Sequence, residues 1–273
     1  MNTVYQPDID HILSLRHTNG GDFWATADGR VYAGNPFSTV NAAFLLSELG
    51  VGHDDPAMQG AVELVLAKWR EDGRFAIAPG SVYPCQTAQA VRLLCRLGLA
   101  EDERVQTSFR HLLDTQHEDG GWRCKKFFFG HGPETEFSNP GPTLEILDTF
   151  RYTAMANREE RLDRAVEFLL RHWETRLPLG PCHYGIGKQF LRVEYPFLKY
   201  NIFYYVYVLS FYKSARGDRR YQEALSHLQS RLVAGQVVVE ETNPKLRQLA
   251  FCRKGAPSAA ATERYAELMN NFK

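Results

Sequence analysis

Five of the Cys and His residues of this chain are candidate zinc ligands, and they fall in segments far apart in the sequence. They are Cys85, Cys124, His131, Cys182 and His183. Three Cys with one His is an accepted tetrahedral zinc set. The spacing matches no zinc-finger pattern, so a shared site depends on the fold, and adjacent Cys182 and His183 can rarely both bind one ion. Two alternatives stay open: a zinc site formed by Cys85, Cys124, Cys182 and His183, or ordinary buried and loop thiols.

Aromatic residues are the second group that could do chemistry, because their faces stabilise cations. The alternative is that they pack as core, as aromatic residues at helical spacing usually do. The residues predicted to line a central cavity, one thiol included, are Tyr83, Cys85, Trp122, Tyr195, Phe197, Tyr200 and Tyr204. Further aromatic residues of the same segments are Phe127, Phe128, Phe129, Phe203, Tyr205 and Tyr207.

Carboxylates form a third group, in segments that read as loops. A pair of them across one opening could perform the acid–base chemistry of a glycosidase, although loop acids are usually solvated. These residues are Asp22, Asp28, Glu134, Glu136, Glu194, Glu240 and Glu241. The chain has no Gly-rich phosphate loop, nucleophile elbow or His-Glu-x-x-His motif.

Composition narrows the class of protein. Lys and Arg together number 32, as do Asp and Glu, so the net charge gives no reason to expect nucleic acid as a partner. Five cysteines in 273 residues favour free thiols over a disulfide framework. No apolar run reaches the roughly 18–20 residues of a membrane-spanning helix, and the N-terminal residues do not resemble a signal peptide. We expect one domain over residues 1–273 and a cytoplasmic location.

A repeat positions all of these residues. Four prolines, Pro36, Pro84, Pro140 and Pro196, each precede an apolar segment at spacings of 48, 56 and 56 residues, and Pro257 repeats the pattern loosely. Proline is favoured at the first position of a helix, so each should mark a helix start. Self-similarity at such a period indicates stacked units. The predicted units are residues 8–54, 55–101, 102–157, 158–217 and 218–272.

Each unit contains two expected helices. The first helices, 8–16, 56–70, 103–116, 161–176 and 218–233, are apolar on one side, and acids before them suit helix N-termini. The second helices, such as 202–212, are apolar nearly all round. These patterns predict an all-α fold with an outer and an inner layer: an α/α toroid of about five hairpins, with the long loops at one end.

The segment Gln116-His-Glu-Asp-Gly-Gly-Trp122 resembles the Gln-x-x-x-Gly-x-Trp motif of terpenoid cyclases and protein prenyltransferase β subunits. On this basis the chain is identified as a member of the prenyltransferase and squalene-oxidase repeat superfamily. The resemblance implies the toroid fold and an isoprenoid ligand. Cys85 matches the zinc-binding cysteine of the prenyltransferases, but Tyr83 stands where they have Asp. The Asp-x-Asp-Asp run of triterpene cyclases does not occur.

Two function classes are compatible with these patterns. The first is a prenyltransferase- or cyclase-like protein that holds an apolar molecule, isoprenoid by resemblance, in a central aromatic cavity, with zinc as a possible cofactor. The second is a non-catalytic module that binds a protein partner. A carbohydrate-active α/α-barrel enzyme is a third, weaker alternative.

Overall fold

A computed structural model describes residues 3–78, 83–124 and 129–273. Within these ranges the chain forms eleven α-helices, short 3₁₀ turns and isolated β-bridges, but no β-strand. The predicted all-α class is therefore confirmed. Of the residues singled out above, Phe127 and Phe128 lie outside the described ranges. No helix of the described residues is long and apolar enough to cross a membrane.

The first helix of each predicted unit is present close to its expected start. These helices are α1 (Gln6–Ser14), α3 (Pro56–Leu66), α5 (Glu103–Asp114), α7 (Glu160–Thr175) and α10 (Arg219–Gln229). Three of them begin directly after an aspartate whose carboxylate accepts a hydrogen bond from a backbone N–H of the first turn. These aspartates are Asp55, Asp102 and Asp218. Each carboxylate satisfies a donor that the helix itself leaves unpaired.

The second helices are α2 (Thr39–Glu48), α4 (Pro84–Arg96), α6 (Pro140–Phe150), α8 (Ile202–Leu209) and α11 (Ala259–Asn270). All eight residues of α8 are buried, in line with its uniformly apolar sequence. A further short helix, α9 (Lys213–Arg216), follows α8 and was not predicted.

The prediction that every proline starts a helix is correct only for Pro84 and Pro140, which are the first residues of α4 and α6. Pro36 and Pro196 lie several residues before α2 and α8. These helices begin instead after Ser38 and Asn201, whose side-chain oxygens accept backbone N–H groups of the first turn. A polar cap therefore decides the helix start where the proline stands too early.

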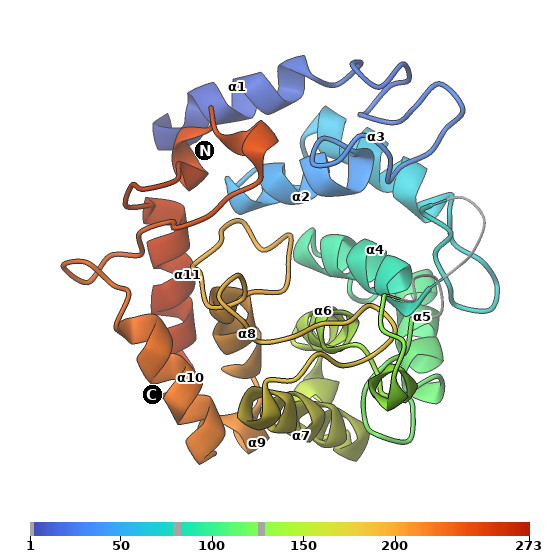
Figure 1. Cartoon of the computed structure of the whole chain (residues 1–273). Helices are drawn as coiled ribbons and strands as arrows, with labels where there is room; N and C mark the ends of the chain where they lie inside the picture. Colours follow the sequence, from blue (N-terminus) through green and yellow to red (C-terminus); the bar gives the residue numbers. More distant parts are fainter. Residues whose placement is uncertain (1–2, 79–82, 125–128) are drawn as a thin grey trace.

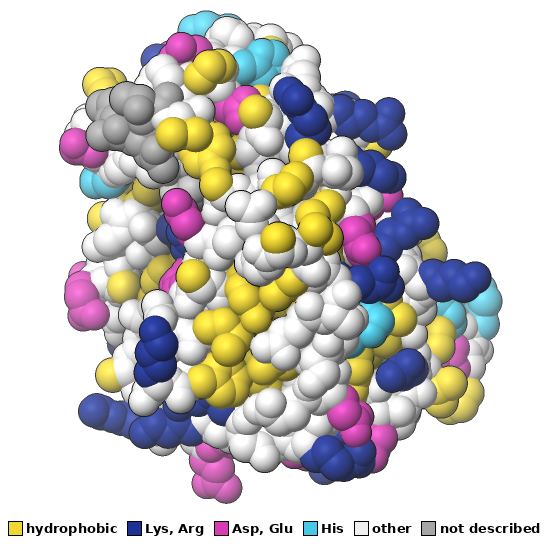
Figure 2. Space-filling model, turned by 90° about the vertical axis from the view of Figure 1, so that its left-hand side faces the viewer, with side chains coloured by type: hydrophobic (Ala, Val, Ile, Leu, Met, Phe, Trp, Pro, Cys, Tyr) yellow, Lys and Arg dark blue, Asp and Glu magenta, His cyan; other side chains and the backbone are white. Residues whose placement is uncertain are grey.

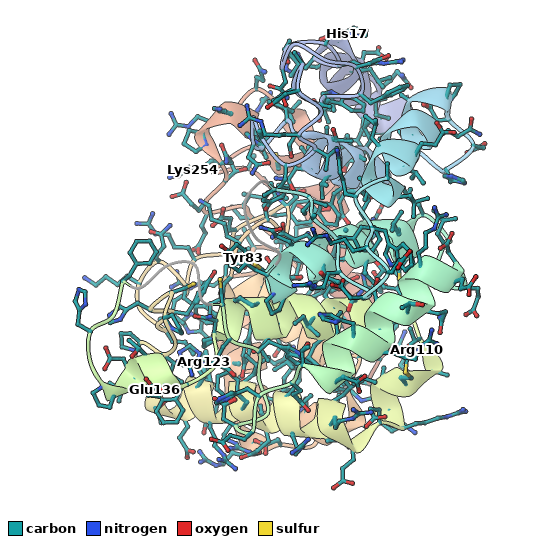
Figure 3. All side chains as sticks on the ribbon, turned by 90° about the vertical axis from the view of Figure 1, so that its right-hand side faces the viewer. His17, Tyr83, Arg110, Arg123, Glu136 and Lys254 are labelled. Atoms are coloured by element: carbon teal, nitrogen blue, oxygen red, sulfur yellow. The ribbon has the colours of Figure 1, made fainter. Side chains whose placement is uncertain are left out.

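Helices α2, α4, α6 and α8 lie towards the middle of the molecule, and α1, α3, α5, α7 and α10 lie around them (Figure 1). Figure 3 shows Tyr83, Arg123 and Glu136 towards one end, opposite Arg110 of α5. We call this end, which carries the loops that lead into α4 and α6, the loop end. On the side formed by α1, α10 and α11, hydrophobic side chains gather near the middle, with basic side chains around them (Figure 2).

The Gln116–Trp122 segment joins neighbouring units. The Gln116 amide donates to the carbonyls of Gly120 and of Arg161, at 2.6 and 2.7 Å, which links this loop to α7. The indole of buried Trp122 donates to the Leu112 carbonyl at 2.7 Å. Gly120 has φ +94°, and a Cβ there would lie 2.5 Å from the Arg164 carbonyl oxygen, so only glycine fits the close approach. The motif has a structural role in this chain.

Candidate functional site

A pocket of about 370 Å³ opens at the loop end, beside the N-terminal ends of α4 and α6. Its walls come from five segments of the chain that are far apart in sequence. The described residues that line it are Tyr32, Asn35, Ala78, Tyr83, Cys85, Gln86, Gln89, Cys124, Pro142, Glu145, Cys182 and Tyr184. Three of the four residues proposed for zinc and two of the seven proposed for a cavity thus face one space.

Local hydrogen bonds bring the three cysteines together. Cys85 is the second residue of α4, immediately after Pro84. Cys124 follows Trp122, whose backbone N–H donates to the Thr143 hydroxyl of α6 at 3.1 Å. The backbone N–H of Cys182 donates to the Asn139 side-chain oxygen at 2.9 Å. Both connecting loops are therefore attached to the beginning of α6.

Cys124 is the central thiol of the group. Hydrogen bonding with Cys124, together with burial, raises the pKa of Cys85 well above its usual range and raises the pKa of Cys182 in the same way. Cys124 itself is buried, whereas Cys85 and Cys182 are partly exposed. Because their pKa values are raised, Cys85 and Cys182 are neutral at pH 7 in this arrangement.

Glu145 is the acidic residue of the pocket. Burial raises its pKa to about 7, although the charge of Arg92 and hydrogen bonding from Gln89 act in the opposite direction. The Gln89 side-chain nitrogen lies 3.3 Å from each carboxyl oxygen of Glu145. Near neutral pH, Glu145 can therefore both donate and accept a proton, as a general acid or base must.

A buried acceptor and an aromatic wall complete the pocket. The side-chain oxygen of Gln86 is buried and has no hydrogen-bond partner, which is costly unless a bound molecule supplies a donor. The Tyr184 ring lies over Gly141, where a Cβ would be 2.6 Å from the ring. Burial raises the pKa of Tyr184, so its hydroxyl stays neutral. Because residue 141 is a glycine, the Tyr184 ring has room to lie there and to form one wall of the pocket.

The other residues proposed for a cavity pack in the middle of the molecule. Tyr195 and Phe197 contact each other edge to face, with ring centroids 5.4 Å apart, and Phe197 stacks on Tyr204 at 5.1 Å. Tyr200 stacks on His172, and its hydroxyl lies 2.9 Å from the His172 ring. Together with Trp122, these side chains do not line the pocket at the loop end.

Buried charges occupy the same central region, which sequence reasoning missed. Arg92 lies 3.3 Å from Asp148, and the Tyr204 hydroxyl donates to Asp148 at 2.8 Å. Further out, Arg96 lies 2.7 Å from Glu48. Arg151 forms a second ion pair with Asp148. We call Glu48, Arg92, Arg96, Asp148 and Arg151 the central charge cluster.

A sequence signal for this cluster exists in the repeat. Arg92, Asp148 and Tyr204 follow one another at intervals of 56 residues, the spacing of the prolines. Phe44 holds the equivalent place in α2, with its ring centroid 4.2 Å from the Arg92 guanidinium carbon. We therefore expect charged side chains that hold the same position in successive inner helices to contact one another.

The remaining ligand candidates lie elsewhere. His183 does not line the pocket, and its Nδ1 atom lies 3.9 Å from a Glu134 oxygen. His131 is exposed. The loop carboxylates form ion pairs with basic neighbours: Asp22 with Arg16, Asp28 with Arg30, Glu136 with Arg123, Glu194 with Lys199, Glu240 with Arg231 and Glu241 with Lys254. Of these acids Glu194 is buried, and burial raises its pKa.

In residues 3–78, 83–124 and 129–273, no three His, Cys, Asp or Glu side chains are already arranged to hold a metal ion. No protein-family model matches the chain, and no curated protein matches it. The function must therefore be inferred from the geometry and chemistry of the pocket.

Proposed function

We propose that this protein binds a small, uncharged and mainly apolar molecule in the pocket at the loop end, within a small α/α toroid of the prenyltransferase and terpenoid-cyclase type. A short isoprenoid is the candidate ligand. The observation that carries the proposal is the pocket, where tyrosine rings and a proline surround three thiols and one carboxyl group. Its volume of about 370 Å³ lies at the lower end of the range for small-molecule sites.

The charges of the pocket favour an uncharged ligand. The described lining residues include no Lys or Arg that could hold a diphosphate. The tyrosines Tyr32 and Tyr184 stay neutral because burial raises their pKa values. An alcohol or a hydrocarbon therefore fits better than an anion, whose transfer into such a site would lack a compensating charge.

Glu145 is the residue we propose for chemistry on the ligand. As a neutral acid near pH 7 it could protonate a double bond or a hydroxyl group of a bound molecule. A general acid acts best when its pKa lies near the working pH. The unpaired side-chain oxygen of Gln86 would accept a hydrogen bond from a ligand hydroxyl.

Thermal unfolding with added ligands tests the binding proposal. Geraniol and farnesol should raise the melting temperature in a concentration-dependent way, because a ligand that binds only the folded state stabilises it. Geranyl diphosphate should have less effect. Tyr184→Ala, which removes one wall of the pocket, should reduce the shift. Tyr265→Ala is the matched control, because Tyr265 belongs to α11 and does not line the pocket.

Each variant is compared with its own ligand-free melting temperature, so a general loss of stability does not enter the result. The absence of any shift at saturating isoprenoid would refute the proposal. Equal reductions in Tyr184→Ala and Tyr265→Ala would show that the ligand acts outside the pocket.

A second candidate function is a non-catalytic module that binds a protein partner. The observation that favours it is the packed middle of the molecule, where Tyr195, Phe197 and Tyr204 contact one another. Affinity purification under native conditions tests this function. Demonstrated turnover together with the absence of a stoichiometric partner would exclude it.

A further inference from the structure

We propose that Cys85, Cys124 and Cys182 bind one Zn²⁺ ion through three thiolates and leave a fourth coordination position open to the pocket. The inference rests on the proposed function and deepens it, because it assigns a metal ion to the thiol-bearing part of the same pocket. It also changes the ligand set expected from the sequence, since His183 is directed to Glu134 and does not line the pocket.

The first argument is convergence. The three thiols come from the start of α4, from the loop after Trp122 and from the loop before Tyr184, yet they line one pocket. Hydrogen bonding links Cys124 to Cys85 and to Cys182. The two other cysteines of the chain are buried and do not line this pocket. Thiolates are among the ligands that zinc prefers, and three protein ligands are enough for a site that keeps one position open.

The second argument comes from the surroundings of the thiols. The buried side-chain oxygen of Gln86, on the same wall, lacks a partner. The described lining contains no Lys or Arg that would repel a cation, and it contains the carboxyl group of Glu145. A zinc ion with three protein ligands and one free position is the arrangement of catalytic rather than structural sites. Glu145 lines the same pocket as the three thiols and would be available to act on a molecule bound there.

Binding requires a defined chemical change. Three S–H bonds are lost, three S–Zn bonds form, and three protons leave for solvent, so that Zn²⁺ with three thiolates carries one net negative charge. The hydrogen bonds among the thiols are replaced by coordination, and the sulfur atoms move closer to one centre. Such coupling of metal binding to proton release is general for thiolate sites.

The test uses the full-length, untagged protein after treatment with a chelator and a thiol reductant. Titration with Co²⁺ should give thiolate-to-metal charge-transfer absorption that saturates at one equivalent, and Zn²⁺ should abolish it. In weakly buffered solution, an indicator dye should report about three protons released per Zn²⁺. Cys85→Ser, Cys124→Ser and Cys182→Ser should each weaken Zn²⁺ binding at least about tenfold.

Cys95→Ser is the matched control and should bind Co²⁺ like the wild type, because Cys95 lies in α4 but not in the pocket. Circular dichroism shows whether each variant is folded. Absence of saturation at one equivalent in the wild type would overturn the proposal, as would unchanged affinity in folded Cys124→Ser. Metal binding without any isoprenoid-induced shift in melting temperature would refute the isoprenoid ligand and leave the zinc site standing. A shift with isoprenoid but no metal binding would refute the zinc site alone.

Discussion

Helices α4 and α6 face each other at two levels, one helical turn apart, and the two levels differ in charge. Near the pocket Gln89 contacts Glu145, and deeper in the molecule Arg92 contacts Asp148. Burial raises the pKa of Glu145 to about 7. Burial acts on Asp148 in the same direction, but the guanidinium groups of Arg151 and Arg92 outweigh it and lower the pKa of that carboxyl. The upper carboxyl is therefore partly protonated near pH 7, and the lower one is ionised.

The difference shows how one fold supports two kinds of polar group. An amide at position 89 cannot neutralise a carboxylate, so the buried acid keeps its proton. The guanidinium of Arg92 can neutralise a carboxylate, so Asp148 is ionised and forms a buried ion pair with it. The lower level fills the middle of the molecule with a buried pair of opposite charges, and the upper level leaves a group that can exchange a proton.

The largest expected effect is at the lower level. Asp148→Ala should lower the free energy of unfolding by about 3–5 kcal/mol, because it leaves the buried charge of Arg92 without its partner. Urea denaturation at pH 7 measures the change. Glu145→Ala is the matched variant one turn away and should cost clearly less, since its contact is with a neutral amide. Equal losses would remove the distinction between the two levels.

The next effect is a pH dependence at the upper level. Because the pKa of Glu145 is higher in the folded than in the unfolded state, the folded protein binds more protons between about pH 4.5 and 7, so its stability falls as pH rises through this range. Relative to Glu145→Gln, the wild type should lose at most about 3 kcal/mol between pH 4 and 8.

Denaturant unfolding of both proteins across this pH range checks the prediction. Glu136→Gln, at an exposed residue of the loop end, is the control and should keep the pH dependence of the wild type. A constant difference between wild type and Glu145→Gln would mean that the pKa of Glu145 is the same in the folded and unfolded states.

The smallest effect concerns the thiols of the upper level. In metal-free protein at pH 8, Cys124→Ala should accelerate alkylation of Cys85, because hydrogen bonding with Cys124 is the main cause of its raised pKa. A fall of one pKa unit would raise the thiolate fraction about tenfold. Mass spectrometry of the modified peptides gives the rate. Cys95→Ala should leave the rate for Cys85 unchanged, and an unchanged rate in Cys124→Ala would show that burial alone suppresses reactivity.

Much of the helical framework could be predicted from the sequence, because its signals are local. Aspartates before α3 and α5 predicted their starts, and the apolar runs predicted buried inner helices. The proline rule alone placed the starts of α2 and α8 too early, because Ser38 and Asn201 cap these helices, whereas the apolar run from residue 202 marked the start of α8 correctly.

The candidate site could be predicted only in part. The repeat suggested that Cys85, Cys124 and Cys182 lie at one end, and the pocket contains all three. Glu145 was not predicted as a site residue, because it lies within an apolar helix, where a single acidic residue forms no local pattern. Its repeat position, 56 residues after Gln89, was the one signal in the sequence that pointed to it.

The sequence by itself determined which of the longer segments form helices, which faces they bury and which loops carry sulfur, because these properties depend on neighbours a few residues away. Only the tertiary structure decided which side chains share the pocket and which close the middle of the molecule. The protonation of Glu145 and Asp148 was decided there too, because a buried carboxyl responds to charges that other helices bring within a few ångströms.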